Sequence, residues 1–425
     1  MTPGLQTEKL DDGLYRTTAE SGVTVISEVI ASVRSVAVGI WVRTASVHET
    51  ASCMGISHLL EHMVFKGTER RSARDIAFEL EVRGGSLDAF TAREHTSYQA
   101  RVLDEDLPRA LDVLTDLVRN PVLRDSDLEL ERNVILEEIS TVQDTPDDLV
   151  FDLHGSTLWP DHPYGFSILG TAETVHALQT SDLKKLHRAA YHPRHVVIAA
   201  AGNLNHEVLL NLLGKCGWFT FEPGPEPASV EPVPAAQRTH RHVERDLAQT
   251  HIVLGTDTFG YADERRYALM LLNTVLGGGM SSRLFQRVRE ELGLAYAVYS
   301  FHSFYKHTGV TGVYVGTGPA TAEPALEAIM GELTTLARDG LSEDVLTQAK
   351  QQLKGQVTLG LESPASRMYR AAGVVLYGQP YMTIDQVLVK IGEVSAEQVA
   401  EVGVEFFEPG RQTVVWLGPK GASQQ

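Results

Sequence analysis

The stretch Gly55–Thr68 reads Gly-Ile-Ser-His-Leu-Leu-Glu-His-Met-Val-Phe-Lys-Gly-Thr, and the rest of the chain is interpreted around it. In a helix, His58 and His62 stand at i and i+4 on one face, and Glu61 borders that face. Two imidazoles at this spacing can share one zinc ion and leave room for a third ligand and a water. A carboxylate beside that water can act as general base and then as general acid. The pattern His-x-x-Glu-His is the inverse of the commoner His-Glu-x-x-His zinc motif.

The motif also has a purely structural explanation, a buried helix end with two hydrogen-bonded histidines. Its apolar flanks, Leu59-Leu60 and Met63-Val64-Phe65, predict a mostly buried helix. Three titratable side chains on a buried helix cost free energy unless they are paired or bound to a metal. The flanks therefore favour the metal site.

A third zinc ligand is sought on the long helix predicted at Asp125–Gln143. Glu137 falls on a polar face of this helix, whereas Glu131 and Glu138 are seven residues apart on a largely apolar face that includes Val134. A charge on that face needs a partner. We interpret Glu138 as the third ligand and Glu131 as a residue that supports a ligand or contacts substrate. A lone carboxylate paired with an arginine is the alternative.

Composition limits the class of protein. The net charge of −18 over 425 residues argues against a nucleic-acid partner, because phosphate binding needs a basic surface. No run of eighteen apolar residues is present, so we expect no membrane span. Cys53 and Cys216 are far apart in sequence, and Met1–Asp12 has no apolar signal core. These features predict a reduced, cytoplasmic protein.

Hydrophobic periodicity predicts further elements along the chain. We expect strands at 23–27, 35–43 and 196–202, two short strands within 86–103, and helices at 72–83, 107–118, 125–143 and 205–213.

The chain divides near its midpoint. Five prolines between Phe221 and Gln237 predict an extended linker, and segments after it resemble segments 216 positions earlier. We therefore predict a zinc-binding domain at 1–220, a Pro-rich linker at 221–240 and a diverged domain without metal at 241–425. The metal motif is not repeated. Leu271–Leu284 stands where a second copy of the His helix would be expected, and Gln351–Lys354 stands where a second copy of Glu138 would be expected.

With these motifs in place, the chain resembles the pitrilysin family of inverted-motif zinc peptidases, whose short members include the mitochondrial processing peptidase β subunit and bacterial homodimeric peptidases. The resemblance runs from about Val23 to Pro409. It is carried by the His motif, Phe65–Thr68, Ala89–Thr91, Glu131–Glu138, Gly277–Phe285 and Arg289–Tyr296. It implies one zinc per chain bound by His58, His62 and Glu138, Glu61 as the base, and substrate contacts from Arg289 and Tyr296.

The resemblance also assigns roles to two other segments. It implies that the edge strand Ala89-Phe90-Thr91 pairs with the substrate backbone, although Asp88 stands where the family has Asn and can only accept hydrogen bonds when ionised. It implies that Gly277-Gly278-Gly279 is a flexible substrate loop or hinge, with a helix C-cap and turn as the alternative. From spacing alone, Arg289 is a solvated helix charge and Tyr296 a core aromatic.

The architecture expected from this similarity is α+β, with two homologous domains, each a mixed sheet with helices on one face, forming half of a clamshell. Two chains would close around a chamber as a homodimer with composite active sites. The implied activity is a zinc endopeptidase acting on oligopeptides or unstructured segments, preferentially basic because the chain is acidic. Precursor processing and peptide clearance both stay open. The competing hypothesis is a non-catalytic scaffold subunit.

Overall fold

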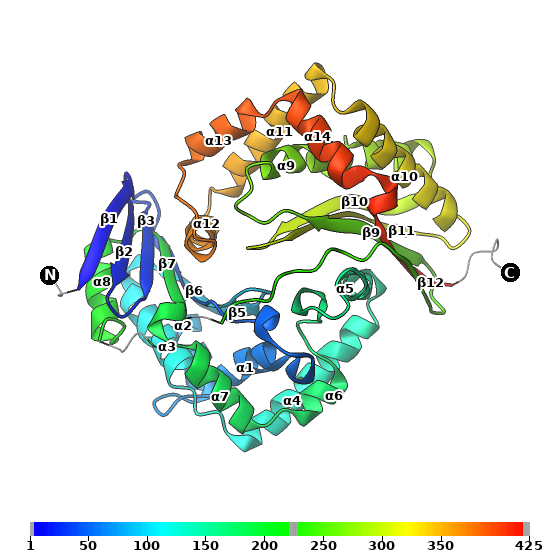
Figure 1. Ribbon diagram of the computed structural model, residues 1–425. Helices are drawn as coiled ribbons and strands as arrows, with labels where there is room; N and C mark the ends of the chain where they lie inside the picture. The colour runs from blue at the N-terminus through cyan, green and yellow to red at the C-terminus, as the bar shows by residue number, and fades with distance from the viewer. Residues whose placement is uncertain (1–3, 221–223, 225, 227, 420–425) are drawn as a thin grey trace. The chain divides into compact units, whose positions relative to one another are not determined.

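The computed structural model describes residues 4–220, 224, 226 and 228–419, which form two compact units (Figure 1). Both units are discontinuous in sequence. Unit 1 comprises Met1–Ser140, Phe166–Val230 and Gly360–Tyr381; unit 2 comprises Thr141–Gly165, Glu231–Leu359 and Met382–Gln425. The units therefore differ from the predicted sequential domains, because each half of the chain gives one segment to the other unit.

The predicted linker at 221–240 lies partly outside the described residues. Residues 221–223, 225 and 227 are not described, and residues 228–239 contain neither helix nor strand. The strand β8 then begins at His240.

Unit 1 is built on a mixed seven-stranded sheet in the order β1-β2-β3-β7-β4-β6-β5. Strands β3 and β7 are parallel, and the other neighbours are antiparallel. The strands are β1 (Leu5–Asp11), β2 (Leu14–Ala19), β3 (Thr24–Val29), β4 (Ser35–Val42), β5 (Ser86–Thr91), β6 (Thr96–Leu103) and β7 (Val196–Gly202).

Helices cover both faces of this sheet, because its central strands are apolar on both sides. Val25 and Val38 pack into the main core of the unit, whereas Ile26 and Trp41 pack on the opposite face against α12 (Pro364–Leu376) from the second half of the chain. The other helices of the unit are α1 (Ile56–Val64), α2 (Ala73–Glu81), α3 (Leu107–Arg119), α4 (Asp125–Gln143), α6 (Ala172–Ala177), α7 (Thr180–Ala190) and α8 (His206–Lys215).

Unit 2 has a five-stranded mixed sheet in the order β10-β11-β9-β12-β8. One of its faces packs against α5 (Pro146–Leu158), which comes from the first half of the chain. The strands are β8 (His240–Glu244), β9 (Thr250–Thr258), β10 (Ala295–Phe304), β11 (Gly309–Thr317) and β12 (Thr413–Gly418). The other helices are α9 (Arg266–Gly277), α10 (Ala322–Asp339), α11 (Glu343–Gly360), α13 (Ile384–Glu393) and α14 (Ala396–Phe407).

Short helical turns join these elements. They lie at Ser46–His48, Ala51–Cys53, Asp104–Asp106, Pro163–Gly165, Pro193–His195 and Pro409–Arg411, with a π-helix at Phe285–Glu291.

The two sheets share one topology. The order β5-β6-β4-β7-β3 in unit 1 corresponds to β10-β11-β9-β12-β8 in unit 2, and the last pair is parallel in both. Two similar mixed sheets with helices confirm the predicted α+β fold class. The expectation of helices on one face is incomplete, because α12 and α5 each cover a second face that is apolar as well.

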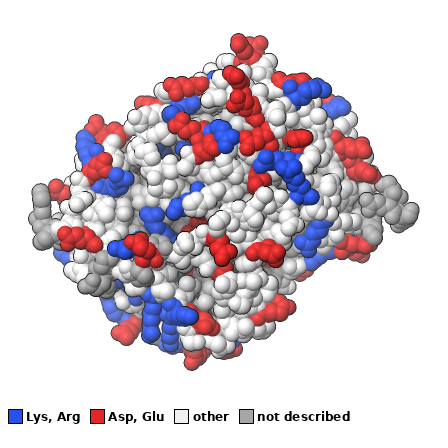
Figure 2. All heavy atoms as spheres, in the orientation of Figure 1, with Lys and Arg blue, Asp and Glu red and all other residues white. Residues whose placement is uncertain are grey.

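No helix in the described part of the chain is long and apolar enough to cross a membrane. Acidic and basic side chains are interspersed over the face of the molecule in Figure 2 rather than separated into large fields of one sign.

Candidate metal centre

The local structure of α1 sets the positions of the two histidines. The helix begins after Gly55, whose φ of 88° lies in the left-handed region. A Cβ added to Gly55 would lie only 2.6 Å from the carbonyl oxygen of Leu169, so this position requires glycine. The Glu49 carboxylate accepts hydrogen bonds from the backbone N–H groups of Gly55 and Ser57, at 2.8 and 2.9 Å. The first turn of α1 is thus capped by a buried acid.

The apolar side of α1, with Leu59, Leu60 and Met63 fully buried, is fixed in the core of unit 1. His58 and His62 therefore face away from that core, with ring centroids 4.6 Å apart. The i, i+4 spacing predicted from the sequence is realised in the helix.

The structure brings His58, His62 and Glu138 together, with one ligand atom of each within 4.8 Å of the others. Glu138 Oε2 lies 3.7 Å from His58 Nε2, and its Oε1 lies 3.6 Å from His62 Nε2. Ligand atoms on a tetrahedral zinc are separated by roughly 3.4 Å, given zinc–ligand bonds of about 2.0–2.1 Å. The two imidazoles and one carboxylate therefore fit a zinc ion with an open fourth position.

His58 and His62 are each set up for metal binding by a different neighbour or environment. Burial, with a smaller contribution from His62, lowers the pKa of His58 to about 4, so its ring is neutral at pH 7. The Nδ1 atom of His62 lies 3.0 Å from Glu131 Oε2, which leaves Nε2 as the metal-facing nitrogen. Glu131 is itself held by Lys66, whose Nζ lies 2.6 Å from Oε1.

Helix α4 presents its carboxylates as the apolar-face argument predicts. Glu131 is buried, Glu138 is partly buried at the histidines, and Glu137 is exposed. Val134, which we expected on the inward face, is 43% exposed and lies at the edge of that face.

The general-base candidate Glu61 is buried on the same helix. The hydroxyl of Thr91 donates a hydrogen bond of 2.6 Å to Glu61 Oε2. Burial raises the pKa of Glu61, while Thr91 and His62 lower it and the nearby Glu138 and Asp88 raise it further. A carboxylate with a raised pKa beside a metal site is suited to taking up a proton and giving it back.

Strand β5 lies at the edge of the sheet and carries the predicted segment. Ala89 packs on the core, Phe90 contacts the rings of His95 and Tyr369, and Thr91 reaches Glu61. Asp88 is exposed, and its Oδ1 accepts a hydrogen bond from the backbone N–H of Ala89.

In unit 2, Arg289 and Tyr296 are brought together. The guanidinium lies 4.6 Å from the Tyr296 ring and from the Phe285 ring, and donates to the Tyr296 carbonyl at 3.2 Å. Tyr296 is 77% exposed on β10, so the core-aromatic alternative is wrong.

The Gly-rich segment matches the C-cap alternative. Helix α9 ends at Gly277 and is capped at Gly278. A Cβ on Gly277 would lie 2.2 Å from the backbone nitrogen of Ser300, so this glycine permits close packing of α9 on β10.

Three contacts at the centre were missed by sequence reasoning. Lys66 and Thr91 lie within the motifs that carry the resemblance, but their partners Glu131 and Glu61 are far away in sequence. Glu49 is the third, and its only sequence signal is an acid shortly before the helix.

Comparison with known proteins places these features in a family. The profile described as insulinase, peptidase family M16, matches residues 24–172, and that of the peptidase M16 inactive domain matches residues 177–353. An uncharacterised zinc protease of Streptomyces coelicolor is 40% identical over 418 residues, covering 96% of this chain and 91% of that protein. The uncharacterised zinc protease YmxG of Bacillus subtilis is 39% identical over 395 residues, covering 93% and 96%.

Solved structures agree in fold. A Pseudomonas fluorescens structure described as a peptidase M16 inactive domain superposes with a TM-score of 0.89 at 22% identity, covering 99% of this chain and 98% of that one. A fold likeness at this identity leaves the activity open, whereas the sequence matches extend over nearly the whole chain. By these matches, the chain belongs to peptidase family M16.

Proposed function

We propose that this protein is a zinc endopeptidase that hydrolyses peptide bonds in oligopeptides or unstructured segments. The observation that carries the proposal is the convergence of His58, His62 and Glu138 on one point, with Glu61 held on the same helix. Zinc proteases among the relatives support the same activity. A scaffold subunit would have no need to keep three metal-ligand side chains and a buried carboxylate together.

The chemistry that zinc supplies when bound at this site is Lewis-acid catalysis. The residues of the chain do the rest. Glu61 accepts a proton from the attacking water and later donates it to the leaving amine nitrogen. The hydrogen bond from Thr91 to Oε2 restrains the orientation of the Glu61 carboxylate. Glu131 and Lys66 hold the ring of His62 in the orientation that a ligand needs.

The substrate class rests on two weaker supports. An edge strand such as β5 can take up an extended peptide as an additional strand, which a folded protein does not offer. The net charge of −18 favours basic peptides through long-range attraction. Equal cleavage rates for matched acidic and basic peptides at low salt would remove the charge argument.

The proposal is tested by digesting a random peptide library and reading the cut sites by mass spectrometry. We expect internal cuts that stop after treatment with a chelator and return when zinc is added. Digestion that continues in the fully metal-free protein, or a zinc-loaded protein that cuts no peptide, would contradict the proposal. Release of terminal residues only would point to an exopeptidase.

We also propose that the active enzyme is a homodimer with shared sites, in which Arg289 and Tyr296 of one chain serve the zinc centre of its partner. The support is the resemblance and the placement of the two groups in different units of one chain. A Glu61→Gln chain co-expressed with an Arg289→Ala/Tyr296→Phe chain tests this. The mixed dimer should regain activity although each homodimer is inactive, and an inactive mixed dimer isolated by two tags would reject shared sites.

A further inference from the structure

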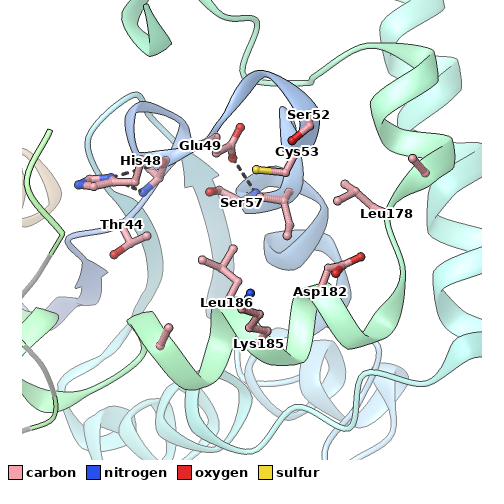
Figure 3. Close-up of a pocket in the computed structure, with 14 residues that line it drawn as sticks. Thr44, His48, Glu49, Ser52, Cys53, Ser57, Leu178, Asp182, Lys185 and Leu186 are labelled. Carbon is pink, nitrogen blue, oxygen red and sulfur yellow. Dashed lines mark hydrogen bonds between the residues drawn. The ribbon is translucent and has the colours of Figure 1, made fainter. Parts of the chain in front are cut away.

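A cavity of about 430 Å³ lies in unit 1 at the beginning of α1, on the side of Glu49 (Figure 3). This volume is in the range of small-molecule sites, about 300–1,000 Å³. Its walls come from the loop before α1 with the first turn of α1, and from the end of α6 with α7, two regions more than a hundred residues apart in sequence. Neither the proposed reaction nor the comparisons assign it a ligand.

The carboxylate of Glu49 is the unusual group in this cavity. Glu49 is 5% exposed, and among the described residues it forms no ion pair. Within the described part of the chain, the backbone N–H groups of Gly55 and Ser57 donate hydrogen bonds to this carboxylate, one to each oxygen, and lone pairs remain on both oxygens. A buried carboxylate without a cationic partner is costly, so this group favours a positively charged ligand.

A second buried polar group lies beside it. The hydroxyl of Ser57 is buried and lines the cavity. Although it is close enough to Glu49 to lower the pKa of the carboxyl, it makes no hydrogen bond of normal geometry within the described part of the chain. Buried hydroxyls normally have a partner, so a ligand atom at this point would satisfy both groups.

The remaining lining residues indicate the chemistry of the part of a ligand that lies away from Glu49. Ile56, Leu178 and Leu186 present apolar surface. From α7, Asp182 and Lys185 contribute one charge of each sign, so these two charges offset each other and Glu49, when ionised, gives the cavity its negative charge. No group of three metal-ligating side chains is found here among the described residues, which argues against a metal ion.

We propose that this cavity binds a small primary amine with an apolar body, its ammonium group on the Glu49 carboxylate and its body against Leu178 and Leu186. The ammonium supplies the missing cation and a donor for the Ser57 hydroxyl. Because Glu49 also caps α1, the ligand would contact the helix that carries His58 and His62. The proposal stands apart from the peptidase activity, since binding can be measured without hydrolysis.

The two cysteines provide a test with an internal control. Cys53 lines this cavity, whereas Cys216 lines a different cavity, and both are partly exposed. Alkylation by iodoacetamide, followed at each cysteine by peptide mass spectrometry, should slow at Cys53 in the presence of phenethylamine. At ten times the dissociation constant we expect slowing of about tenfold, with the rate at Cys216 unchanged. Equal rates at Cys53 with and without the amine, or equal slowing at both cysteines, would overturn the proposal.

Matched variants locate the binding. Leu186→Trp should fill the cavity and abolish saturable phenethylamine binding by calorimetry, whereas Leu212→Trp, a half-buried leucine of the cavity around Cys216, should leave it intact. Thermal unfolding confirms that both variants fold. The matched acid, phenylpropionate, should bind at least about tenfold more weakly because its charge meets Glu49. Binding that survives Leu186→Trp, or an acid that binds as well as the amine, would reject the assignment.

Discussion

Helices α1 and α9 occupy corresponding places in two sheets of the same topology, yet their polar side chains are used differently. In α9, Asn273 donates hydrogen bonds to the Phe301 carbonyl and the Thr311 hydroxyl, at 3.0 and 3.1 Å. In α1, His58 and His62 turn their Nε2 atoms toward Glu138 of α4. The helix of unit 2 satisfies Asn273 within the protein, whereas that of unit 1 presents two imidazole Nε2 atoms beside the carboxylate of Glu138.

Helices α4 and α11, which follow α1 and α9 in the chain, differ in the same way. Helix α4 brings Glu131 and Glu138 to the histidines, whereas α11 has Lys354 at the position that corresponds to Glu138. A cation at that position cannot bind a metal ion. The duplicated domains thus share the topology of the sheet, whereas the candidate metal ligands are present in unit 1 and replaced at the corresponding positions of unit 2. Fold and function therefore have to be inferred separately.

The largest effect is expected from Glu61→Gln. We expect turnover to fall by about two to four decades, because the amide cannot take up the proton of the attacking water. Zinc content should stay at the wild-type level, since Glu61 is not a ligand. Peptide cleavage and metal analysis on the same sample check both parts, and near-wild-type activity would show that Glu61 is not the base.

Replacing each of two neighbouring carboxylates on α4 by an amide tests which face of the helix binds the metal. Glu138→Gln should lower zinc affinity by more than about 100-fold, because even the partners that only orient ligands are worth 10–100-fold. Glu137→Gln is the matched control, because Glu137 is exposed, and it should bind zinc normally. Competition with a coloured chelator measures both, and the reverse result would overturn the face assignment.

The acid at the start of α1 should make stability depend on pH in the opposite direction from the acid before α9, because Asp263 accepts a hydrogen bond from the backbone N–H of Arg265 and has a lowered pKa. Burial raises the pKa of Glu49 from 4.5 to about 7. The folded protein then holds a proton that the unfolded chain has released, so this stabilisation is full below pH 4.5 and is lost as the pH rises through about 7.

Urea unfolding of the metal-free protein at several pH values measures this loss, with Glu49→Gln as the comparison. Relative to that variant, the wild type should lose up to about 3 kcal/mol between pH 4.5 and pH 8. Parallel pH profiles for the two proteins would show that Glu49 does not titrate in this range.

The smallest effect is expected from Asn273→Ala in unit 2. Loss of two hydrogen bonds at a buried position should destabilise the protein by about 1–3 kcal/mol. Zinc content should not change, because α9 has no part in the metal centre. Urea unfolding and metal analysis give the two readings, and a loss of zinc would mean that the units are less independent in chemistry than their folds suggest.

Local pattern was enough for much of the fold. The bounds of α4 and β7 agree with the prediction, because a polar-apolar face and a run of β-branched and small apolar residues are signals within one element. The hairpin of β1 and β2 was missed because five of the seven residues of β1 are exposed and show no alternation. Helix α5 from the first half of the chain packs in unit 2, and α12 from the second half packs in unit 1. This arrangement depends on tertiary packing, which hydrophobic periodicity does not indicate.

The candidate site divides in the same way. His58, His62 and Glu138 follow from helix geometry and from the cost of charges on an apolar face. The pairs Lys66–Glu131 and Thr91–Glu61 join residues on different elements, so only the folded structure shows them. The sequence indicates which groups carry the chemistry, and tertiary contacts determine how each is held.

The most direct test of the account is the position of the metal. Anomalous diffraction at the zinc edge from a zinc-loaded crystal should show one strong site per chain, about 2.0–2.2 Å from Nε2 of His58, Nε2 of His62 and a carboxylate oxygen of Glu138. A zinc peak at other side chains, or no peak between these three in a crystal that contains zinc elsewhere, would contradict the account.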